Sequence, residues 1–390
     1  MKIDSPNILF ISSWYPTDKK TAGTFVEMLA LVLNKKRGNV AVLLYDYISF
    51  GTWIKNGFRF IKFPKYRKNP NIKFIEVKTI LLPSFLDRYN KRLIQVNALR
   101  KVRSFAPDLI HQHGIVNGTY ITEFLSNKFN VPYVYTEHAP FEVGEKINLH
   151  HPFVNLFEIK EFIKKAKLRM AVSHFYANVY SQLFDCPFDV VPNVVSDDFI
   201  QSDRKDDSKV FYFLSVGYLE KIKNHALLID AFAILLKKNP AVKLKIVGSG
   251  TLFNSLATQV KKYNIQNEVE FLGTLNRENL KNQYKISHAL VVSSEKETFG
   301  VVAVEAFFAG LPVISTRCGG TEELINSTNG LITDTNSALG LAEKMNEIVM
   351  NYSLYNSREI KLTAIANYGE DAITNKLFKI YTQSMAALPI

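Results

Sequence analysis

Residues 295–320, EKETFGVVAVEAFFAGLPVISTRCGG, decide how the rest of this chain is interpreted. Two glutamates, Glu297 and Glu305, stand on either side of seven mostly apolar residues. The run ALVVSS just before the stretch predicts a buried strand, so Glu297 falls in the connecting loop. Thr298 is the expected N-cap of the following helix, Gly300 its start, and Glu305 lies one to two turns inside it.

This arrangement suits a ligand that carries both phosphate and sugar groups. A helix start offers unpaired N–H groups and the positive end of the helix dipole, and Gly300 lets a ligand approach the backbone. A carboxylate only accepts hydrogen bonds, so it suits the paired hydroxyls of a sugar. The pattern therefore predicts a sugar at Glu297, phosphates at the helix start and a ribose at Glu305. The alternative is structural, with Glu305 capping another helix or pairing with a buried arginine.

Short apolar runs alternate with amphipathic stretches along the 390 residues, which predicts parallel sheets with crossover helices. The fold class is therefore α/β, with two doubly wound domains separated by the polar linker 196–209. In such sheets, ligands bind beyond the carboxyl ends of the strands. The predicted strands are ILFISS, VAVLLYD, KFIEV, DLIHQH, YVYTEH, RMAVS and DVVPN in the first half, and FYFLSVG, LKIVGSG, VEFLG, ALVVSS and PVISTR in the second.

Charge and cysteine content narrow the class of protein. The net charge is +12, and residues 1–200 contribute +10 of it, with 27 Lys/Arg against 17 Asp/Glu. A basic half points to an anionic partner, or only to a soluble surface. Two distant cysteines favour a reducing compartment, and the start of the chain resembles a strand more than a signal peptide. We therefore expect a cytoplasmic protein.

A second candidate phosphate site lies in FLSVGYLEKIKN, residues 213–224. A strand is expected to end at Gly217 and a helix to begin near Asn224, with Lys223 directly before it. A lysine opposes a helix N-terminus unless an anion lies between them, so Lys223 is either a phosphate ligand or a solvated surface residue. The segment lacks the nucleoside-triphosphatase phosphate-loop pattern. GSG at 248–250 is by itself only a tight turn after a strand.

These motifs together resemble the retaining GT-B glycosyltransferases of the large bacterial E-x7-E family, which builds cell-surface polysaccharides and glycolipids. ETFGVVAVE followed by AFFAGLPVISTRCGG carries the resemblance, and VGYLEKIKN, KIVGSG, EFLGTL and VVPNVV extend it in the family's order. In the first half, SSWYPTDKKTAGTFVEMLA and YTEHAPF are similar to the family's opening loop and its T-x-H strand end. The resemblance implies domains at 1–197 and 205–373 facing across a cleft, with the C-terminal helix, about 374–390, crossing back onto the first.

The resemblance also implies a role for each matching residue. The catalytic residues are then His138, beside the reacting carbon and the leaving oxygen, Lys223, on the diphosphate, and Glu297, on the sugar hydroxyls. His111 and His113 are expected to be structural. The implied donor-binding residues are Gly23, Gly217, Lys223, Gly248, Gly250, Leu275 near the base, Glu297, the backbone of Phe299, Gly300, Val301 and Val302 on the diphosphate, and Glu305 on the ribose.

Two departures from the family pattern affect the phosphate site. The family often places an arginine directly after the strand-end glycine, where this chain has Tyr218. One phosphate cation is then missing unless Lys221 or another residue replaces it. The family's first loop often has two adjacent glycines, and here the pair is Ala22 and Gly23, which narrows the backbone approach.

The implied reaction moves a hexosyl unit from a UDP- or GDP-sugar to a hydroxyl of a glycan or lipid-linked acceptor, with retention at the anomeric carbon. Lys223 and the helix start would stabilise the leaving diphosphate, and no Asp-x-Asp pair is present, so we expect no metal and no other cofactor. Alternatives are a nucleotide-sugar epimerase of the same fold and a non-catalytic sugar-nucleotide binder. No nucleic-acid recognition motif is present.

Basic and aromatic residues interleave in WIKNGFRFIKFPKYRK, residues 53–68. That composition suits an interface with anionic lipid, although an ordinary solvated loop has the same composition. The sequence therefore predicts peripheral attachment to the inner face of the cell membrane.

Overall fold

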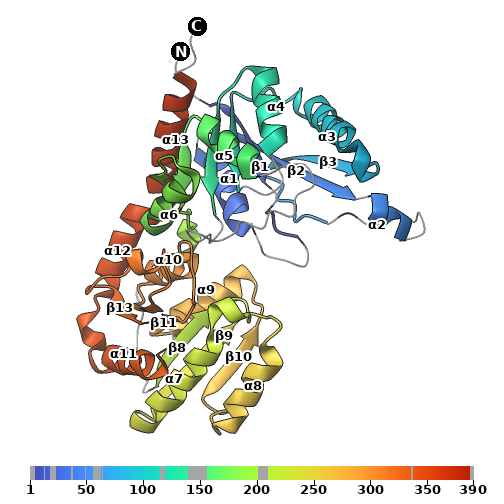
Figure 1. Ribbon diagram of the computed structural model, residues 1–390. Helices are drawn as coiled ribbons and strands as arrows, with labels where there is room; N and C mark the ends of the chain where they lie inside the picture. The colour runs from blue at the N-terminus through green and yellow to red at the C-terminus, as the bar shows by residue number, and fades with distance from the viewer. Residues whose placement is uncertain are drawn as a thin grey trace. The chain divides into compact units, whose positions relative to one another are not determined.

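A computed structural model describes residues 5–12, 14–17, 23–36, 38–48, 50–55, 63, 65–114, 119–138, 156–200, 210–334 and 337–386. The chain divides into two compact units (Figure 1). The first unit comprises Met1–Val194 together with Ile373–Ile390, and the second comprises Val195–Ala372. Each unit is built around its own parallel sheet with helices on both faces.

The first unit has a seven-stranded sheet in the order β3-β2-β1-β4-β5-β6-β7, and every neighbouring pair is parallel. The order reverses between β1 and β4, as in doubly wound folds. Its elements are β1 (Asn7–Ser12), α1 (Thr24–Lys36), β2 (Asn39–Ile48), α2 (Phe50–Lys55), β3 (Lys73–Ile80), η1 (Ser84–Leu86), α3 (Asp87–Val102), β4 (Leu109–His113), α4 (Thr119–Phe129), β5 (Tyr133–Glu137), α5 (Leu156–Lys165), β6 (Arg169–Ala171), α6 (His174–Phe184) and β7 (Asp189–Val190).

Both faces of this sheet are covered because consecutive side chains of a strand point to opposite sides. In β1, Leu9 and Ile11 enter a core with residues of α3, α4, α5 and α6. Ile8 and Phe10 enter the opposite core, which holds residues of α1 and of α13 (Glu370–Ala386). Strands with two buried faces read as continuous apolar runs, which is why ILFIS carries no polar alternation.

The second unit has a six-stranded parallel sheet in the order β10-β9-β8-β11-β12-β13. Its central strands pack under α7, α8 and α11 through residues such as Phe213, Phe232 and Leu244, which are all fully buried. Its elements are η2 (Asp197–Phe199), β8 (Phe211–Val216), η3 (Lys221–Lys223), α7 (His225–Lys238), β9 (Val242–Val247), α8 (Phe253–Lys262), β10 (Val269–Gly273), α9 (Arg277–Ile286), β11 (Ala289–Val292), α10 (Val301–Phe308), β12 (Val313–Thr316), η4 (Glu322–Leu324), β13 (Gly330–Thr333), α11 (Ala338–Met350), η5 (Tyr352–Leu354) and α12 (Ser357–Tyr368).

All twelve expected strands are present, and the structure adds a thirteenth. This is β13, the sequence GLIT, which pairs with β12 at the edge of the sheet. This strand has only four residues and begins with the glycine of the Asn329-Gly330 pair, so the sequence shows too little apolar periodicity for it to be recognised. The predicted linker also differs in extent, because η2 belongs to the second unit. The rest of that linker, residues 201–209, lies outside the described residues.

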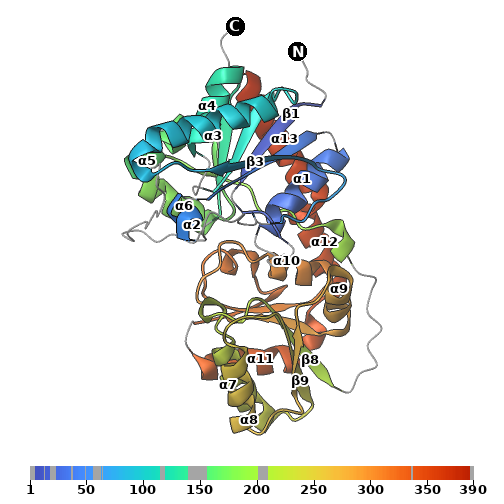
Figure 2. The same ribbon diagram turned by 90° about the vertical axis from the view of Figure 1, so that its right-hand side faces the viewer.

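The C-terminal helix α13 begins at Glu370, and its residues from Ile373 onward belong to the first unit. Ile373, Leu377 and Tyr381 are almost fully buried there in the core that also contains β1 (Figure 2 shows this helix and the first sheet from a second side). None of the helices in the described ranges is long and apolar enough to cross a lipid bilayer.

Candidate active site

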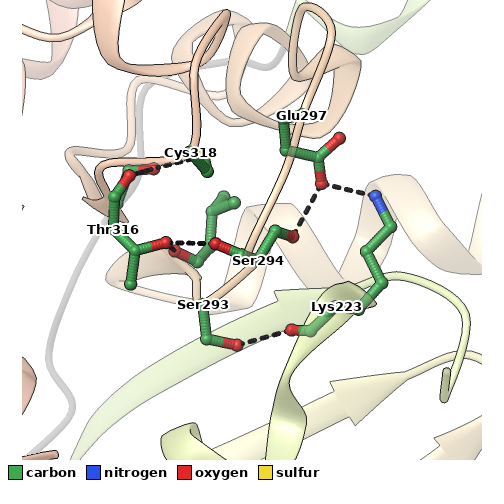
Figure 3. A network of polar contacts seen from close by, with 8 residues as sticks. Lys223, Ser293, Ser294, Glu297, Thr316 and Cys318 are labelled. Atoms are coloured by element: carbon green, nitrogen blue, oxygen red, sulfur yellow. Dashed lines mark hydrogen bonds and ion pairs between the residues drawn. The ribbon is translucent and has the colours of Figure 1, made fainter. Parts of the chain in front are cut away.

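The second unit gathers a cation and a carboxylate where β8 and β11 end. Lys223, in the short helix η3 after β8, forms an ion pair with Glu297, in the loop after β11 (Figure 3). The Ser294 hydroxyl donates to Oε1 of the same carboxylate over 2.7 Å. The side chains of Lys223 and Glu297 are 24% and 13% exposed, so solvent reaches the pair without surrounding it. The two charges therefore face the edge at which parallel sheets bind ligands.

Backbone contacts hold both partners of this pair in place. Glu297 N–H donates to the carbonyl of Cys318 over 2.7 Å, and Gly320 N–H returns a bond to the carbonyl of Glu297 over 2.8 Å. These bonds form a short parallel bridge between the loop after β11 and the loop after β12. On the other side, the Ser293 hydroxyl donates to the carbonyl of Lys223 over 2.9 Å (Figure 3). Two loops that are hydrogen-bonded to each other therefore hold the carboxylate in place.

The helix α10 starts directly after this loop, and its N-cap is Gly300 rather than the expected Thr298. Gly300 has φ +88°, and a Cβ there would lie 2.3 Å from Oγ1 of Thr321. Both facts require glycine, and a glycine cap has no side chain to cover the helix end. The helix's first internal bonds run from Ala303 and later residues to Gly300, so the N–H groups of the preceding Val301 and Val302 are left for a ligand.

Glu305 lies inside α10 and is held by a tyrosine that the sequence analysis did not single out. The hydroxyl of Tyr284, a fully buried residue of α9, donates to Oε2 of Glu305 over 2.7 Å. Burial raises the pKa of Glu305 to about 7, opposed by the hydrogen bond from Tyr284 and by the nearby charge of Arg277. Glu305 thus pairs with a tyrosine and not with a buried arginine, and among the described residues it caps no helix. With its raised pKa, the charge of Glu305 changes near neutral pH.

The predicted glycines Gly217, Gly248 and Gly250 lie in the loops at the carboxyl ends of β8 and β9. A Cβ on Gly248, after β9, would lie 1.9 Å from the carbonyl oxygen of Gly217, after β8, so only glycine fits there. Gly250 packs against the backbone at Leu219, and Leu275 is a half-buried residue after β10. The ring of Phe299 is buried against Tyr368, which leaves its backbone for any contact with a ligand. Direct contacts thus connect Gly248, Gly217, Lys223 and Glu297, whereas Gly250 and Leu275 follow the neighbouring strands β9 and β10 and Glu305 lies inside α10.

The remaining predicted site residues, His138 and Gly23, belong to the first unit. His138 follows β5, and its Nε2 lies 3.2 Å from Nδ1 of His113. His113 packs against His111, whose ring nitrogens contact the Tyr381 hydroxyl at 2.8 Å and the Thr136 hydroxyl at 2.7 Å. Burial lowers the pKa of His138 to about 3 and those of His111 and His113 well below the usual value. All three rings are therefore neutral near pH 7.

These histidines line a small cavity that also contacts Phe25, Pro192 and Asn193. The His138 ring is 4.3 Å from that of Phe25, near the start of α1. Gly23 lies directly before α1 with φ +84°. Among the described residues, Nδ1 of His138 and Nε2 of His113 have no hydrogen-bond partner. The sequence placed His111 and His113 in structural roles, and it did not indicate that they support His138.

Tyr218, at the position of the family arginine, is 46% exposed, and Lys221 is also exposed, two residues before Lys223 in η3. Across the described ranges, no group of three or more His, Cys, Asp or Glu side chains is arranged to hold a metal ion.

Two doubly wound parallel sheets, one of which carries a cation, a carboxylate and an uncovered helix start at its strand ends, are the arrangement expected of a glycosyltransferase with the GT-B fold, which solved structures share. Residues 23–199 match the Glycosyltransferase Family 4 model, and residues 196–362 match the model of glycosyl transferases group 1. The two models together cover residues 23–362, and the chain belongs to the glycosyltransferases of the group 1 and Family 4 type.

Individual relatives agree with this assignment. An uncharacterised glycosyltransferase of Methanocaldococcus jannaschii is 27% identical over 254 residues, which cover 65% of this chain and 68% of the relative. Anabaena HepE in complex with UDP shares the fold with a TM-score of 0.72 and 19% identity, over 96% of this chain and 99% of the other. The lipopolysaccharide outer core galactosyltransferase WaaB gives a TM-score of 0.69 at 19% identity, over 97% and 99% of the two chains.

Proposed function

We propose that this protein is a retaining hexosyltransferase that takes its sugar from a nucleoside diphosphate and passes it to a hydroxyl of a glycan or lipid-linked acceptor. The observation that carries the proposal is the ion pair of Lys223 and Glu297 beside the uncovered start of α10. A transferase needs positive charge where the leaving diphosphate develops and an acceptor of hydrogen bonds where the sugar lies. Lys223, the Val301 and Val302 N–H groups and Glu297 supply those functions.

Donor binding exchanges the partners of this pair. In the ligand-free protein, Lys223 and Glu297 neutralise each other. A diphosphate at the helix start takes Lys223 as its counter-charge, and the hexose hydroxyls donate to the released carboxylate. The site is therefore formed before the donor arrives, and its side chains lose little conformational freedom when the donor binds.

The chemistry follows from charge. As the anomeric carbon becomes oxocarbenium-like, the diphosphate gains negative charge, which Lys223 and the dipole of α10 stabilise. The fixed placement of donor and acceptor in the site lowers the barrier further. Retention and metal independence are parts of this proposal, and the acceptor hydroxyl loses its proton to the leaving phosphate. The UDP bound to HepE, which shares the fold, favours a UDP-sugar among the candidate donors.

A donor screen tests the proposal. UDP-, GDP- and ADP-hexoses are incubated with the protein, with and without EDTA, and the release of nucleoside diphosphate and the anomeric configuration of the product are followed by NMR. We expect release from one nucleotide class, undiminished by EDTA, and a product that keeps the donor's configuration. Interconversion of donors without any acceptor identifies an epimerase. Tight binding without turnover identifies a non-catalytic binder.

Glu305 is expected to make donor binding release protons. Because its pKa is about 7 in the ligand-free protein and ribose hydroxyls favour the ionised carboxylate, binding lowers this pKa. The affinity for UDP therefore rises with pH, by at most about tenfold per unit, and levels off above about pH 7. Calorimetry of UDP binding at about pH 6.5, in buffers of different ionisation enthalpy, measures the protons released. Glu305→Gln removes the protons that Glu305 releases and leaves those that the nucleotide itself releases. Equal proton release in both proteins contradicts the assignment.

His138→Ala is expected to lower kcat by about 100-fold, because the resemblance places this ring beside the reacting carbon and the leaving oxygen. The pKa of His138, about 3, keeps the ring neutral, so the wild-type rate shows no histidine titration between about pH 6 and 8. Turnover and melting temperature are measured together, with His174→Ala as the control for an exposed histidine. Turnover of His138→Ala equal to that of the control excludes the role.

A further inference from the structure

The surface where η1 runs into α3 exposes large apolar side chains in a regular order. Phe85, Tyr89 and Leu93 are 83%, 64% and 43% exposed. Tyr89 and Leu93 are four residues apart and lie on one face of α3, and Phe85 precedes them in η1. Leu82, just before η1, adds a fourth exposed apolar side chain. We call Leu82, Phe85, Tyr89 and Leu93 the α3 stripe; α3 lies at the surface of the first unit in both ribbon views (Figures 1 and 2). Exposed apolar side chains that adjoin one another mark binding surfaces, whereas single scattered ones do not.

Basic residues border the α3 stripe. Arg88 and Arg92 are exposed and stand one residue before Tyr89 and Leu93. Helix α3 contains five basic residues and one acidic residue. Within the described part of the chain, neither arginine forms an ion pair, and the Arg92 guanidinium lies 5.3 Å from the ring centre of Phe124. The surface therefore combines apolar side chains with two arginines that pair with no carboxylate among the described residues, although Lys91 of the same helix lies 4.0 Å from Glu158.

The opposite face of α3 holds the stripe rigidly. Ile94, Ala98 and Val102 are buried in the core of the first unit. Asn90, also fully buried, accepts a 2.7 Å hydrogen bond from the Leu82 N–H and donates one of 3.0 Å to the Leu82 carbonyl. This pair of bonds ties the entry of η1 to the second turn of the helix. Tyr89 and Leu93 are thus presented on the outward-facing surface of α3, and Leu82 and Phe85 are held at its entry.

We propose that the α3 stripe docks the first unit on a membrane surface that contains anionic lipid. Aromatic side chains on an outward-facing helix surface enter the headgroup layer, and adjacent arginines keep their charge at the level of the lipid phosphates. The +10 net charge of residues 1–200 attracts the same surface over a longer range. The inference is independent of the proposed reaction. Half of the predicted lipid segment 53–68, residues 56–62 and 64, lies outside the described residues, and the segment plays no part in this proposal.

Vesicle co-sedimentation of the full chain tests this surface. Vesicles of phosphatidylcholine alone are compared with vesicles that contain about one third phosphatidylglycerol. We expect the wild-type protein to bind only the anionic vesicles, and less at high salt. Phe85→Ser/Tyr89→Ser lowers the partition coefficient at least about tenfold. Arg88→Gln/Arg92→Gln lowers it about 25-fold and reduces the salt dependence, since each basic residue contributes about fivefold.

The matched control is Met350→Ser/Leu354→Ser. These residues of the second unit are 71% and 76% exposed and have no comparable run of basic residues around them, so vesicle binding is expected to stay unchanged. Melting temperatures and nucleoside-diphosphate release report folding and catalysis separately for every variant. Absence of wild-type binding to anionic vesicles overturns the proposal, as does equal binding by the wild type and both stripe variants. Dimerisation that is lost in Phe85→Ser/Tyr89→Ser, without vesicle binding, assigns the stripe to self-association instead.

Discussion

Replacing Lys223 with methionine is expected to lower kcat/KM by about 10³-fold, the upper end of what the loss of one electrostatic contact to a developing anion costs. The ammonium group lies at the strand ends, paired with Glu297 in the ligand-free protein, and its side chain is only 24% exposed. Water therefore replaces it poorly when negative charge develops on the leaving diphosphate. Methionine replaces the apolar stem of lysine, which packs against Gly217, and lacks only the terminal ammonium group, so the change removes charge with little change in packing.

Two further lysine variants make this measurement specific. Lys238→Met, in the last turn of α7, removes an exposed charge away from the strand ends and is expected to keep wild-type kinetics. Lys221→Met tests whether this exposed lysine takes the place of the arginine that the family often has at the position of Tyr218. A loss of tenfold or more identifies Lys221 as the second phosphate cation. Wild-type turnover by Lys223→Met excludes Lys223 from the reaction.

Glu297→Gln is expected to change binding and turnover in opposite directions. Glutamine keeps the shape and still accepts from Ser294, but it no longer neutralises Lys223. UDP alone, which has no hexose, then binds several-fold more tightly because its diphosphate meets an unpaired lysine. The kcat for the complete donor falls by about 10²-fold, because the charged acceptor of the sugar hydroxyls is lost. Titration calorimetry with UDP and steady-state kinetics with the donor measure the two effects.

The double variant Lys223→Met/Glu297→Gln separates this exchange of partners from two independent roles. If the two side chains exchange partners when the donor binds, the tighter UDP binding of Glu297→Gln disappears once Lys223 is also replaced. Effects on UDP affinity are then strongly non-additive, as expected for groups in contact. Weaker UDP binding by Glu297→Gln itself, or additive effects in the double variant, shows that the carboxylate does not compete with the phosphate for Lys223.

Much of the fold and of the second unit's site was predictable because it depends on local sequence. Apolar runs with buried faces predicted twelve of the thirteen strands in the described part of the chain, and the missing one, β13, is an edge strand of four residues. Asn224 before α7 was correctly placed at the helix start because its side chain caps that helix. The N-cap of α10 was wrongly placed at Thr298, since Thr321, which packs against Gly300, is distant in sequence.

The sequence by itself determined the fold class, the order of the strands along the chain and the membership of a glycosyltransferase family, because these follow from periodicity and from motifs of adjacent residues. Only the tertiary structure decided how those residues act on each other. It paired Lys223 with Glu297, placed Tyr284 on Glu305 and set His113 beside His138. It also left Phe85 and Tyr89 outside the core. Protonation states, ion pairs and exposure depend on groups that meet through space, and these three contacts join residues 21 or more positions apart that no local pattern connects.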